Sequence, residues 1–221
     1  MKKIILLATL VGVTSQFLYA DIVQGGLETS VSAGLNIPIS SSQSGVSVLG
    51  GNTFSSFGTG LDLNLQTVYG LNENSGLGLG VGIMSISPTA ANGYKQFYSS
   101  YLDSSAPDGT INILPIYAVY KYEFKNTQFN PFIQAKLGYA VPISSTTDIT
   151  YGSNTLNESF GGGMFMGVGA GAYLTHNIFL EADINYYQTT QKFTESNGLL
   201  SGSANNNMSF FTTGLQVGYT F

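Results

Sequence analysis

Seven charged side chains stand in alternating stretches of this 221-residue chain, where each would lie on the polar face of a strand. They are Glu28, Asp62, Lys121, Glu123, Lys136, Glu181 and Asp183. Carboxylates and lysines on one enclosed face can neutralise each other as ion pairs, because burying an unpaired charge is costly. The same groups could instead line a water-filled path for cations, since carboxylates outnumber lysines in the set.

Residues typical of catalysis and metal binding are scarce. His176 is the only histidine, and the chain has no cysteine. The lack of cysteine excludes disulfides, thiolate metal sites and cysteine nucleophiles. One histidine without neighbouring ligands makes no metal site, and a hydrolase would need catalytic partners beside it. The sequence therefore predicts neither an enzyme nor a bound metal or cofactor.

The elements that position these charges are expected to cross a membrane as strands. Only 9% of residues are charged and 43% are hydrophobic, whereas a soluble domain carries about 25% charged residues. No apolar run reaches the roughly 18 residues of a transmembrane helix. The longest, residues 4–13, follows Lys2 and Lys3 and precedes Ala20. Residues 1–20 are thus predicted to be a secretory signal peptide, and residues 21–221 a single domain.

Eight segments alternate between apolar residues and small or polar ones, which is the pattern of transmembrane strands. They span residues 26–37, 57–69, 76–86, 111–124, 132–141, 164–174, 178–189 and 208–221. Each is long enough for a tilted crossing of the membrane, which takes about 9 to 11 residues. The prediction is an all-β fold, an eight-stranded antiparallel up-and-down transmembrane β-barrel.

The connections between these segments alternate in length. Residues 39–56, 87–109, 142–163 and 190–207 are long and rich in Ser, Asn, Gly and Thr, whereas residues 70–75, 125–129 and 175–177 are short. Short periplasmic turns and long extracellular loops are typical of outer-membrane barrels. The sequence therefore predicts the outer membrane of a Gram-negative bacterium, with both termini in the periplasm.

Two runs resemble the middle hairpin of small opacity-protein-like and outer-membrane-protein-A-like barrels. They are residues 114–124, LPIYAVYKYEF, and residues 130–139, NPFIQAKLGY. The closing GYTF resembles the C-terminal assembly signal of that family. The resemblance implies insertion among outer-membrane lipids by the β-barrel assembly machinery, with Tyr219 and Phe221 at the recognised positions. It leaves function open, because such barrels include adhesins, tethers, channels and lipid A enzymes.

Glycine recurs at every second position in residues 76–82 and 167–171. A phosphate-binding loop would need a tight turn that opens a helix, so we interpret these glycines as making room inside a barrel that its own side chains fill. The first glycine strand separates Asp62 from Lys121, and the second separates Asp183 from Lys136. We expect both pairs to form across the glycines, which would give a plugged, partly hydrated interior.

The longest loop carries four aromatic residues in a Ser-rich stretch: Tyr94, Phe97, Tyr98 and Tyr101. Tyr supplies a large contact area at low entropy cost, so this loop is a candidate contact for host or matrix ligands; the alternative is that it packs on the barrel mouth. Two functions follow. One is a non-enzymatic barrel for surface interaction, adhesion or outer-membrane structure, and the other is a narrow porin-like channel for small hydrophobic or ionic solutes.

The charge of the chain excludes one class of partner. The formal net charge is −5 and there is no arginine, and removal of residues 1–20 would also remove two lysines. An acidic chain is a poor nucleic-acid binder. We expect no nucleic-acid partner, and a barrel that acts as a monomer.

Overall fold

The computed structural model describes residues 22–45, 54–90, 110–125, 129–143, 147–151, 154–197 and 200–221. The secondary structure in these ranges is entirely β, so they contain no helix long and apolar enough to cross a membrane. The predicted signal peptide and the aromatic loop at residues 94–101 lie outside the described residues.

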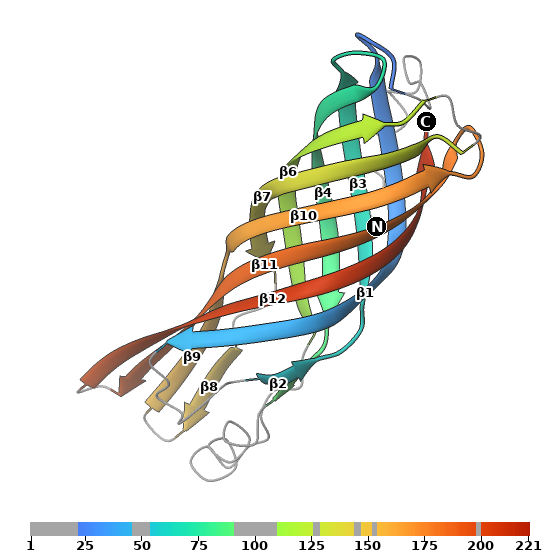
Figure 1. Cartoon of the computed structure of the whole chain (residues 1–221). Helices are drawn as coiled ribbons and strands as arrows, with labels where there is room; N and C mark the ends of the chain where they lie inside the picture. The colour runs from blue at the N-terminus through green and yellow to red at the C-terminus, as the bar shows by residue number, and fades with distance from the viewer. Residues whose placement is uncertain are drawn as a thin grey trace, which may run out of the picture.

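Eight long strands form a closed barrel (Figure 1). They are β1 (Leu27–Gly45), β3 (Gly60–Gly70), β4 (Ser75–Ile86), β6 (Ile111–Glu123), β7 (Pro131–Pro142), β10 (Gly163–Tyr173), β11 (Ile178–Asn197) and β12 (Leu200–Thr220). Each is antiparallel to its neighbours in this order, and β12 pairs back onto β1. All eight expected strands are present, and closure leaves no unpaired barrel edge, which lipid would not tolerate.

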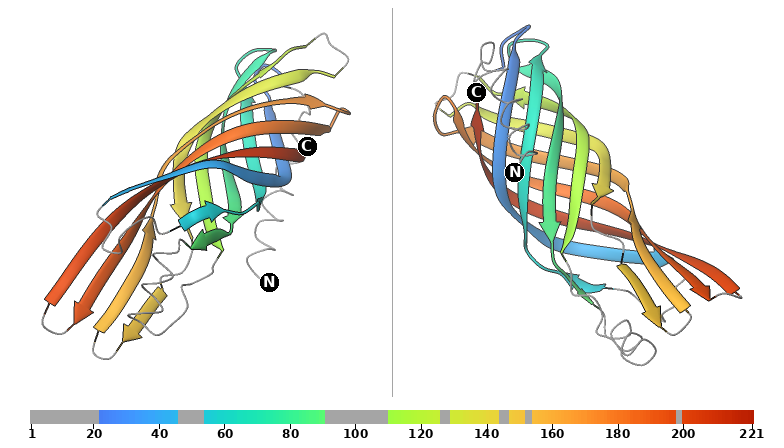
Figure 2. Two further views of the ribbon diagram at one scale, coloured as in Figure 1. Left: turned by 60° about the horizontal axis from the view of Figure 1, so that its bottom comes forward. Right: turned by 180° about the vertical axis from the view of Figure 1, so that it is seen from behind.

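Four shorter strands lie beyond the barrel, at the end opposite the C-terminus (Figure 1). They are β2 (Phe54–Phe57), β5 (Pro88–Ala90), β8 (Thr147–Tyr151) and β9 (Asn154–Gly161). β2 pairs with β5, while β8 and β9 join the extended ends of β11 and β12 in one sheet (Figure 2). We call this end of the barrel the hairpin end and the other the short-turn end.

The long connections predicted at residues 142–163 and 190–207 are present, but most of their residues are strand, which the sequence did not predict. β11 and β12 stay in register from Ile178↔Tyr219 to Asn197↔Leu200. A strand needs an alternating apolar face only where one side meets lipid or a core. Beyond the membrane, ladder hydrogen bonds continue without that pattern, so these residues carry no alternation that would predict strands.

Side chains alternate between the two faces of the barrel wall as the sequence predicts. In β12, Leu215 is 57% exposed and Val217 is 52% exposed, whereas Gln216 between them is 2% exposed. Tyr69, Tyr120 and Tyr219 also point outward, with nearly half of their surface exposed. The outer wall is thus an apolar band with aromatic residues near its short-turn rim, as expected of a lipid-facing barrel.

Side chains cap the backbone in the short turns. Asn72 Oδ1 accepts hydrogen bonds from the backbone N–H groups of Asn74 and Ser75, both at 2.9 Å. Thr175 Oγ1 accepts one from Ile178 N at 3.0 Å. Such local bonds satisfy turn backbone that has no ladder partner. His176 lies exposed in the turn between β10 and β11.

Glycines on the inner face make room for large side chains, as expected. A Cβ on Gly171 would lie 2.8 Å from Cε1 of Phe132, and a Cβ on Gly218 would lie 2.5 Å from Cε1 of Phe179. A Cβ on Gly80 would overlap the Tyr117 ring. The rings fill a barrel too narrow for both a ring and an opposing side chain.

Gly171→Ala is expected to lower the free energy of unfolding by about 1 to 3 kcal/mol, the usual cost of overpacking. The matched control is Gly161→Ala, because its Cβ would lie 3.6 Å from its nearest neighbour, an ordinary contact. Urea unfolding in detergent micelles, followed by the shift of the folded band on gels, measures both. Equal stability of the two variants would contradict the space-making role of Gly171.

Candidate functional site

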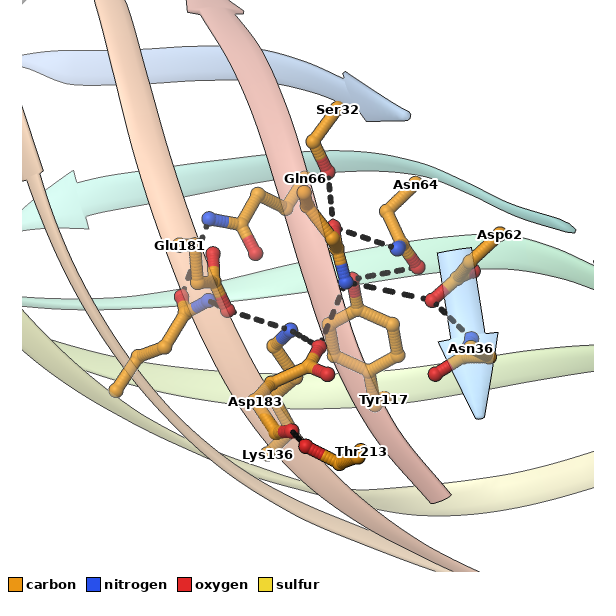
Figure 3. Close-up of polar contacts among 12 residues, drawn as sticks. Ser32, Asn36, Asp62, Asn64, Gln66, Tyr117, Lys136, Glu181, Asp183 and Thr213 are labelled. Atoms are coloured by element: carbon orange, nitrogen blue, oxygen red, sulfur yellow. Dashed lines mark hydrogen bonds and ion pairs between the residues drawn. The ribbon is translucent and has the colours of Figure 1, made fainter. Parts of the chain in front are cut away.

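The barrel interior is built in layers along its axis. Near the short-turn end lies the lower cluster, which consists of Glu28, Lys121, Glu123 and Tyr173. Next to it, towards the hairpin end, lies the central network (Figure 3). This network comprises Ser32, Asn36, Asp62, Asn64, Gln66, Gln134, Lys136, Glu181, Asp183 and Gln216. Towards the hairpin end the interior side chains become apolar. All seven charged residues expected to face the interior are buried, in the lower cluster or in the central network.

Lys121 holds the lower cluster together. Its Nζ lies 2.6 Å from Glu28 Oε1 and 2.9 Å from Glu123 Oε1, and it donates a hydrogen bond of 2.7 Å to the Tyr173 hydroxyl. The same ammonium lies 4.6 Å from the centre of the Phe132 ring. Lys121 is 1% exposed, and a buried charge is tolerated only with such complete pairing.

The start of the described chain covers this cluster. Ile22 is 1% exposed, and its backbone N–H donates to Glu123 Oε2 at 3.2 Å. Lys125 Nζ donates to the Ile22 carbonyl oxygen. The segment before β1 is thus attached to β6 and to the residue two positions beyond it, and it closes the short-turn end over the lower cluster.

Lys136 is the cation of the central network. Its Nζ lies 3.2 Å from Glu181 Oε1 and 3.6 Å from Asp183 Oδ2. These contacts cross β10, where Gly167 lies opposite Lys136 and Gly169 opposite Asp183. The expected ion pair between Lys136 and Asp183 across a glycine strand is therefore present, and Glu181 adds a second carboxylate to it.

Gln216 links two carboxylates of the central network. Its Nε2 donates to Asp183 Oδ2 at 2.6 Å and to Asp62 Oδ2 at 3.3 Å. Its Oε1 accepts from Ser32 Oγ at 2.6 Å and from Asn64 Nδ2 at 3.2 Å. One amide thus joins four strands of the barrel wall, β1, β3, β11 and β12.

The expected pair between Asp62 and Lys121 was wrong. Lys121 lies opposite Gly76 in β4, whereas Asp62 lies opposite Met84 in the same strand. Eight residues of strand separate these two levels, about 26 Å at roughly 3.3 Å per residue. Asp62 instead accepts hydrogen bonds from Asn36 and Gln216. Correct neighbouring strands do not ensure a contact when the residues lie at different heights.

Neutral side chains also bind these charged groups. Tyr173 donates to Glu28 Oε1 at 3.1 Å, and Gln134 Nε2 donates to Glu181. Asn36 Nδ2 donates to Asp62 Oδ2 at 2.9 Å. Tyr173, Gln134 and Asn36 all occupy inward positions of the alternating strands, and this pattern is the sequence feature that places them beside the buried charges.

The outer apolar layer occupies the interior at the hairpin end. It consists of the buried residues Met84, Ile86, Ile111, Ile113, Phe165, Tyr187, Met208 and Phe210. Ring centroids lie 5.0 Å apart for Phe165 and Tyr187, and 5.2 Å apart for Tyr187 and Phe210. Burial of these side chains stabilises the closed barrel and separates the central network from the hairpin end.

The predicted assembly residues lie at the outer rim of the short-turn end. Tyr219 is paired with Val31 of β1 and points outward. The backbone N–H of Phe221 donates to Thr29 O at 2.9 Å, and the rings of Tyr219 and Phe221 meet edge to face with centroids 5.1 Å apart. Both side chains are placed on the closing seam between β1 and β12.

A closed ring of eight strands with an apolar outer wall and a charged, hydrogen-bonded interior defines a transmembrane β-barrel of the bacterial outer membrane. The chain belongs to the family of outer membrane protein beta-barrel domains, whose model matches residues 5–221. Its location is therefore the outer membrane of a Gram-negative bacterium. No curated protein matches the sequence.

Solved structures share this fold at low sequence identity. Outer membrane protein OprG from Pseudomonas aeruginosa is 14% identical, with a TM-score of 0.58, over 92% of this chain and 99% of that chain. Outer membrane protein AlkL in lipid bilayers is 14% identical, with a TM-score of 0.53, over 90% and 91%. The attachment invasion locus protein Ail of Yersinia pestis is more distant, with 13% identity and a TM-score of 0.43 over 90% and 100%.

Lys121→Met is expected to lower the free energy of unfolding by about 3 to 5 kcal/mol, because it leaves Glu28 and Glu123 buried without a cation. Lys192→Met is the matched control, since Lys192 is exposed on β11 beyond the barrel. Urea unfolding of the refolded proteins in micelles compares the two. A Lys121→Met barrel as stable as the control would show that the lower cluster contributes nothing to stability.

Proposed function

We propose that this protein is a non-enzymatic surface barrel that displays a rigid extracellular sheet for contact with a partner. The observation that carries the proposal is the unbroken register of β11 and β12, which pair up to Asn197↔Leu200 beyond the barrel. β9 pairs with β11 over seven residue pairs there, and β8 pairs with β9. A sheet anchored in a closed barrel presents a fixed surface, so binding costs little ordering entropy.

The closed interior supports a surface role over an ion channel. The lower cluster and the central network are held by buried ion pairs, and Lys121 and Lys136 are at most 5% exposed. The outer apolar layer follows on the hairpin side. Ions crossing this barrel would have to break buried ion pairs and enter an apolar layer, both of which are costly.

The non-enzymatic character is part of the same proposal. His176, the only histidine, lies in the exposed turn before β11, at the short-turn end. The carboxylates of the central network are bound to amides and to Lys136. A general base and its partner would need to lie within hydrogen-bond reach of each other and of a substrate.

The partners of the barrel follow as further parts of the proposal. The outward apolar band contacts outer-membrane lipids, and the assembly machinery recognises Tyr219 and Phe221 at the closing seam. The aromatic loop with Tyr94 and Tyr98 contributes to the contact surface for host or matrix ligands. The barrel acts as a monomer, since ring closure already pairs every barrel strand.

A second candidate function is sideways passage of small apolar solutes from the hairpin end into the membrane. The pairing of β4 with β6 is interrupted between Val81↔Ile116 and Met84↔Ile113. Pro115 lies in this gap and has no N–H for the ladder. Met84 and Ile113 belong to the outer apolar layer, so this interrupted seam of the wall adjoins an apolar part of the interior.

Replacing residues 193–204 by Asn-Gly, a tight-turn sequence, keeps the Lys192↔Asn205 pair and removes the projecting tip of the β11–β12 hairpin. Bacteria displaying this variant should adhere to matrix-coated wells and epithelial monolayers no better than cells without the protein. Deletion of residues 94–102 separates the loop contribution from that of the sheet. Wild-type adherence of both variants, at equal surface amounts, would contradict the surface role.

The solute route makes a different prediction. Pro115→Val supplies the missing N–H and should strengthen the β4–β6 seam, so uptake of an apolar dye by liposomes carrying the barrel should fall. The control is Pro38→Val, at the irregularity between β1 and β12. Discrete ionic openings of the wild type in planar bilayers would argue for a water-filled path and against both proposals.

A further inference from the structure

Of the eight buried oxygen atoms without a hydrogen-bond partner that the structure describes on β1, β3, β11 and β12, four are candidate ligands. They are Asn36 Oδ1 on β1, Asp62 Oδ1 on β3, Asp183 Oδ1 on β11 and Thr212 Oγ1 on β12. These four residues are at most 3% exposed. β3, β1, β12 and β11 are consecutive in the barrel wall. In their register Asn36 and Asp183 share one level, with Asp62 and Thr212 one inward position away on opposite sides, and we call this part of the inner surface the patch. Unpartnered buried oxygens cost free energy and require a ligand or another explanation.

Gly214 lies at the centre of this patch. It is paired with Asn36 on one side and with Asp183 on the other. A Cβ on Gly214 would overlap Asp183 Oδ1 and lie 3.0 Å from Asn36 Oδ1. Both unpartnered oxygens therefore face the same space, which exists because residue 214 has no side chain. Thr212 lies two positions along the same inner face of β12.

The hydrogen-bond donors of the central network are already used on the other oxygens. Asp62 Oδ2 accepts from Asn36 Nδ2 and Gln216 Nε2, and Asp183 Oδ2 accepts from Gln216 Nε2 and lies 3.6 Å from Lys136 Nζ. The orientation of the Asn36 amide is fixed, because only its NH₂ group can donate to a carboxylate. Its carbonyl oxygen then faces Asp183, and an ionised carboxylate has no proton to donate to it.

The charge of the central network is also unbalanced. Asp62, Glu181 and Asp183 stand against Lys136 alone, so two negative charges lack a compensating cation within the network. Glu181 takes the shorter contact with Lys136. The excess charge therefore falls on Asp62 and Asp183, the two carboxylates whose Oδ1 atoms are unpartnered.

We propose that one calcium ion binds in the space beside Gly214, held by Asn36 Oδ1, Asp183 Oδ1, Asp62 Oδ1 and Thr212 Oγ1, with water in the remaining positions. Calcium accepts about six to eight oxygen ligands, including carboxylates, amide carbonyls and water, in flexible geometry. Magnesium demands a near-ideal octahedron, which side chains from four strands of a wall do not offer. A divalent ion also matches the two uncompensated charges.

This site departs from the sequence expectation that no metal binds. Acidic and histidine residues alone do not reveal it, because no group of three or more His, Cys, Asp or Glu side chains in the described ranges could hold a metal ion. Half of the proposed protein ligands are neutral oxygens, from Asn36 and Thr212. The ion would join β3 to β11 through the closing seam and fix the unpaired oxygens in place.

The experiment measures calcium retained by the full mature chain, residues 21–221, refolded into detergent micelles with calcium and then desalted. The wild type should retain about one calcium per barrel by elemental analysis. Its heat-induced unfolding temperature should be about 5 °C or more higher in excess calcium than in chelator, as expected for a ligand at about 100 times its Kd.

Asp183→Asn and Gly214→Ala should lose both the retained ion and the calcium-dependent shift. The matched control is Gly218→Ala on the same strand, because its Cβ would meet the Phe179 ring, outside the central network; this variant should keep both. If Gly214→Ala does not fold, the isosteric Asp183→Asn decides. A wild type without retained calcium, or equal retention by Asp183→Asn, would overturn the proposal, as would an infrared carboxylic acid band that Asp62→Asn removes.

Discussion

The pairing of every barrel strand with two neighbours is the constraint on which the rest of the structure depends. In lipid, a free strand edge would leave backbone N–H and C=O groups without partners, so β12 must return to β1. Eight strands then enclose a space that side chains just fill. Each inward position must therefore fit its neighbours in both volume and charge. Lys121 meets two carboxylates and a tyrosine, and Gly171 makes room for Phe132.

The interior changes character along the barrel axis, and this order bears on function. Ion pairs at the short-turn end give way to an amide-rich network and then to an apolar layer at the hairpin end. A hydrated ion would encounter ion pairs, hydrogen-bonded amides and an apolar layer along this axis. An apolar molecule that enters at the hairpin end would contact apolar side chains. The two proposed functions, surface contact and sideways passage of apolar solutes, would therefore use the same end of the molecule, and neither would require the lower cluster to open.

The period-two pattern was sufficient to predict the barrel, because lipid outside and a filled interior impose alternation on all eight strands. It predicted the burial of Glu28 and Lys136 and the crossing of β10 by Lys136 towards Asp183. Heights along the strands were not predictable, since they depend on the stagger between strands, and Asp62 was assigned the wrong partner for this reason. The hairpin of β11 and β12 was missed because strands surrounded by water need no apolar face.

The glycine-lined inner faces have a consequence for how this sequence can change over generations. An outward residue such as Leu215 can be exchanged for another apolar residue, because lipid adapts to its shape. Gly80, Gly171 and Gly218 cannot gain even a methyl group without displacing a ring. Neutral drift is thereby directed to the outer wall and the projecting sheet, so the surface of the protein can diversify while its interior stays nearly fixed.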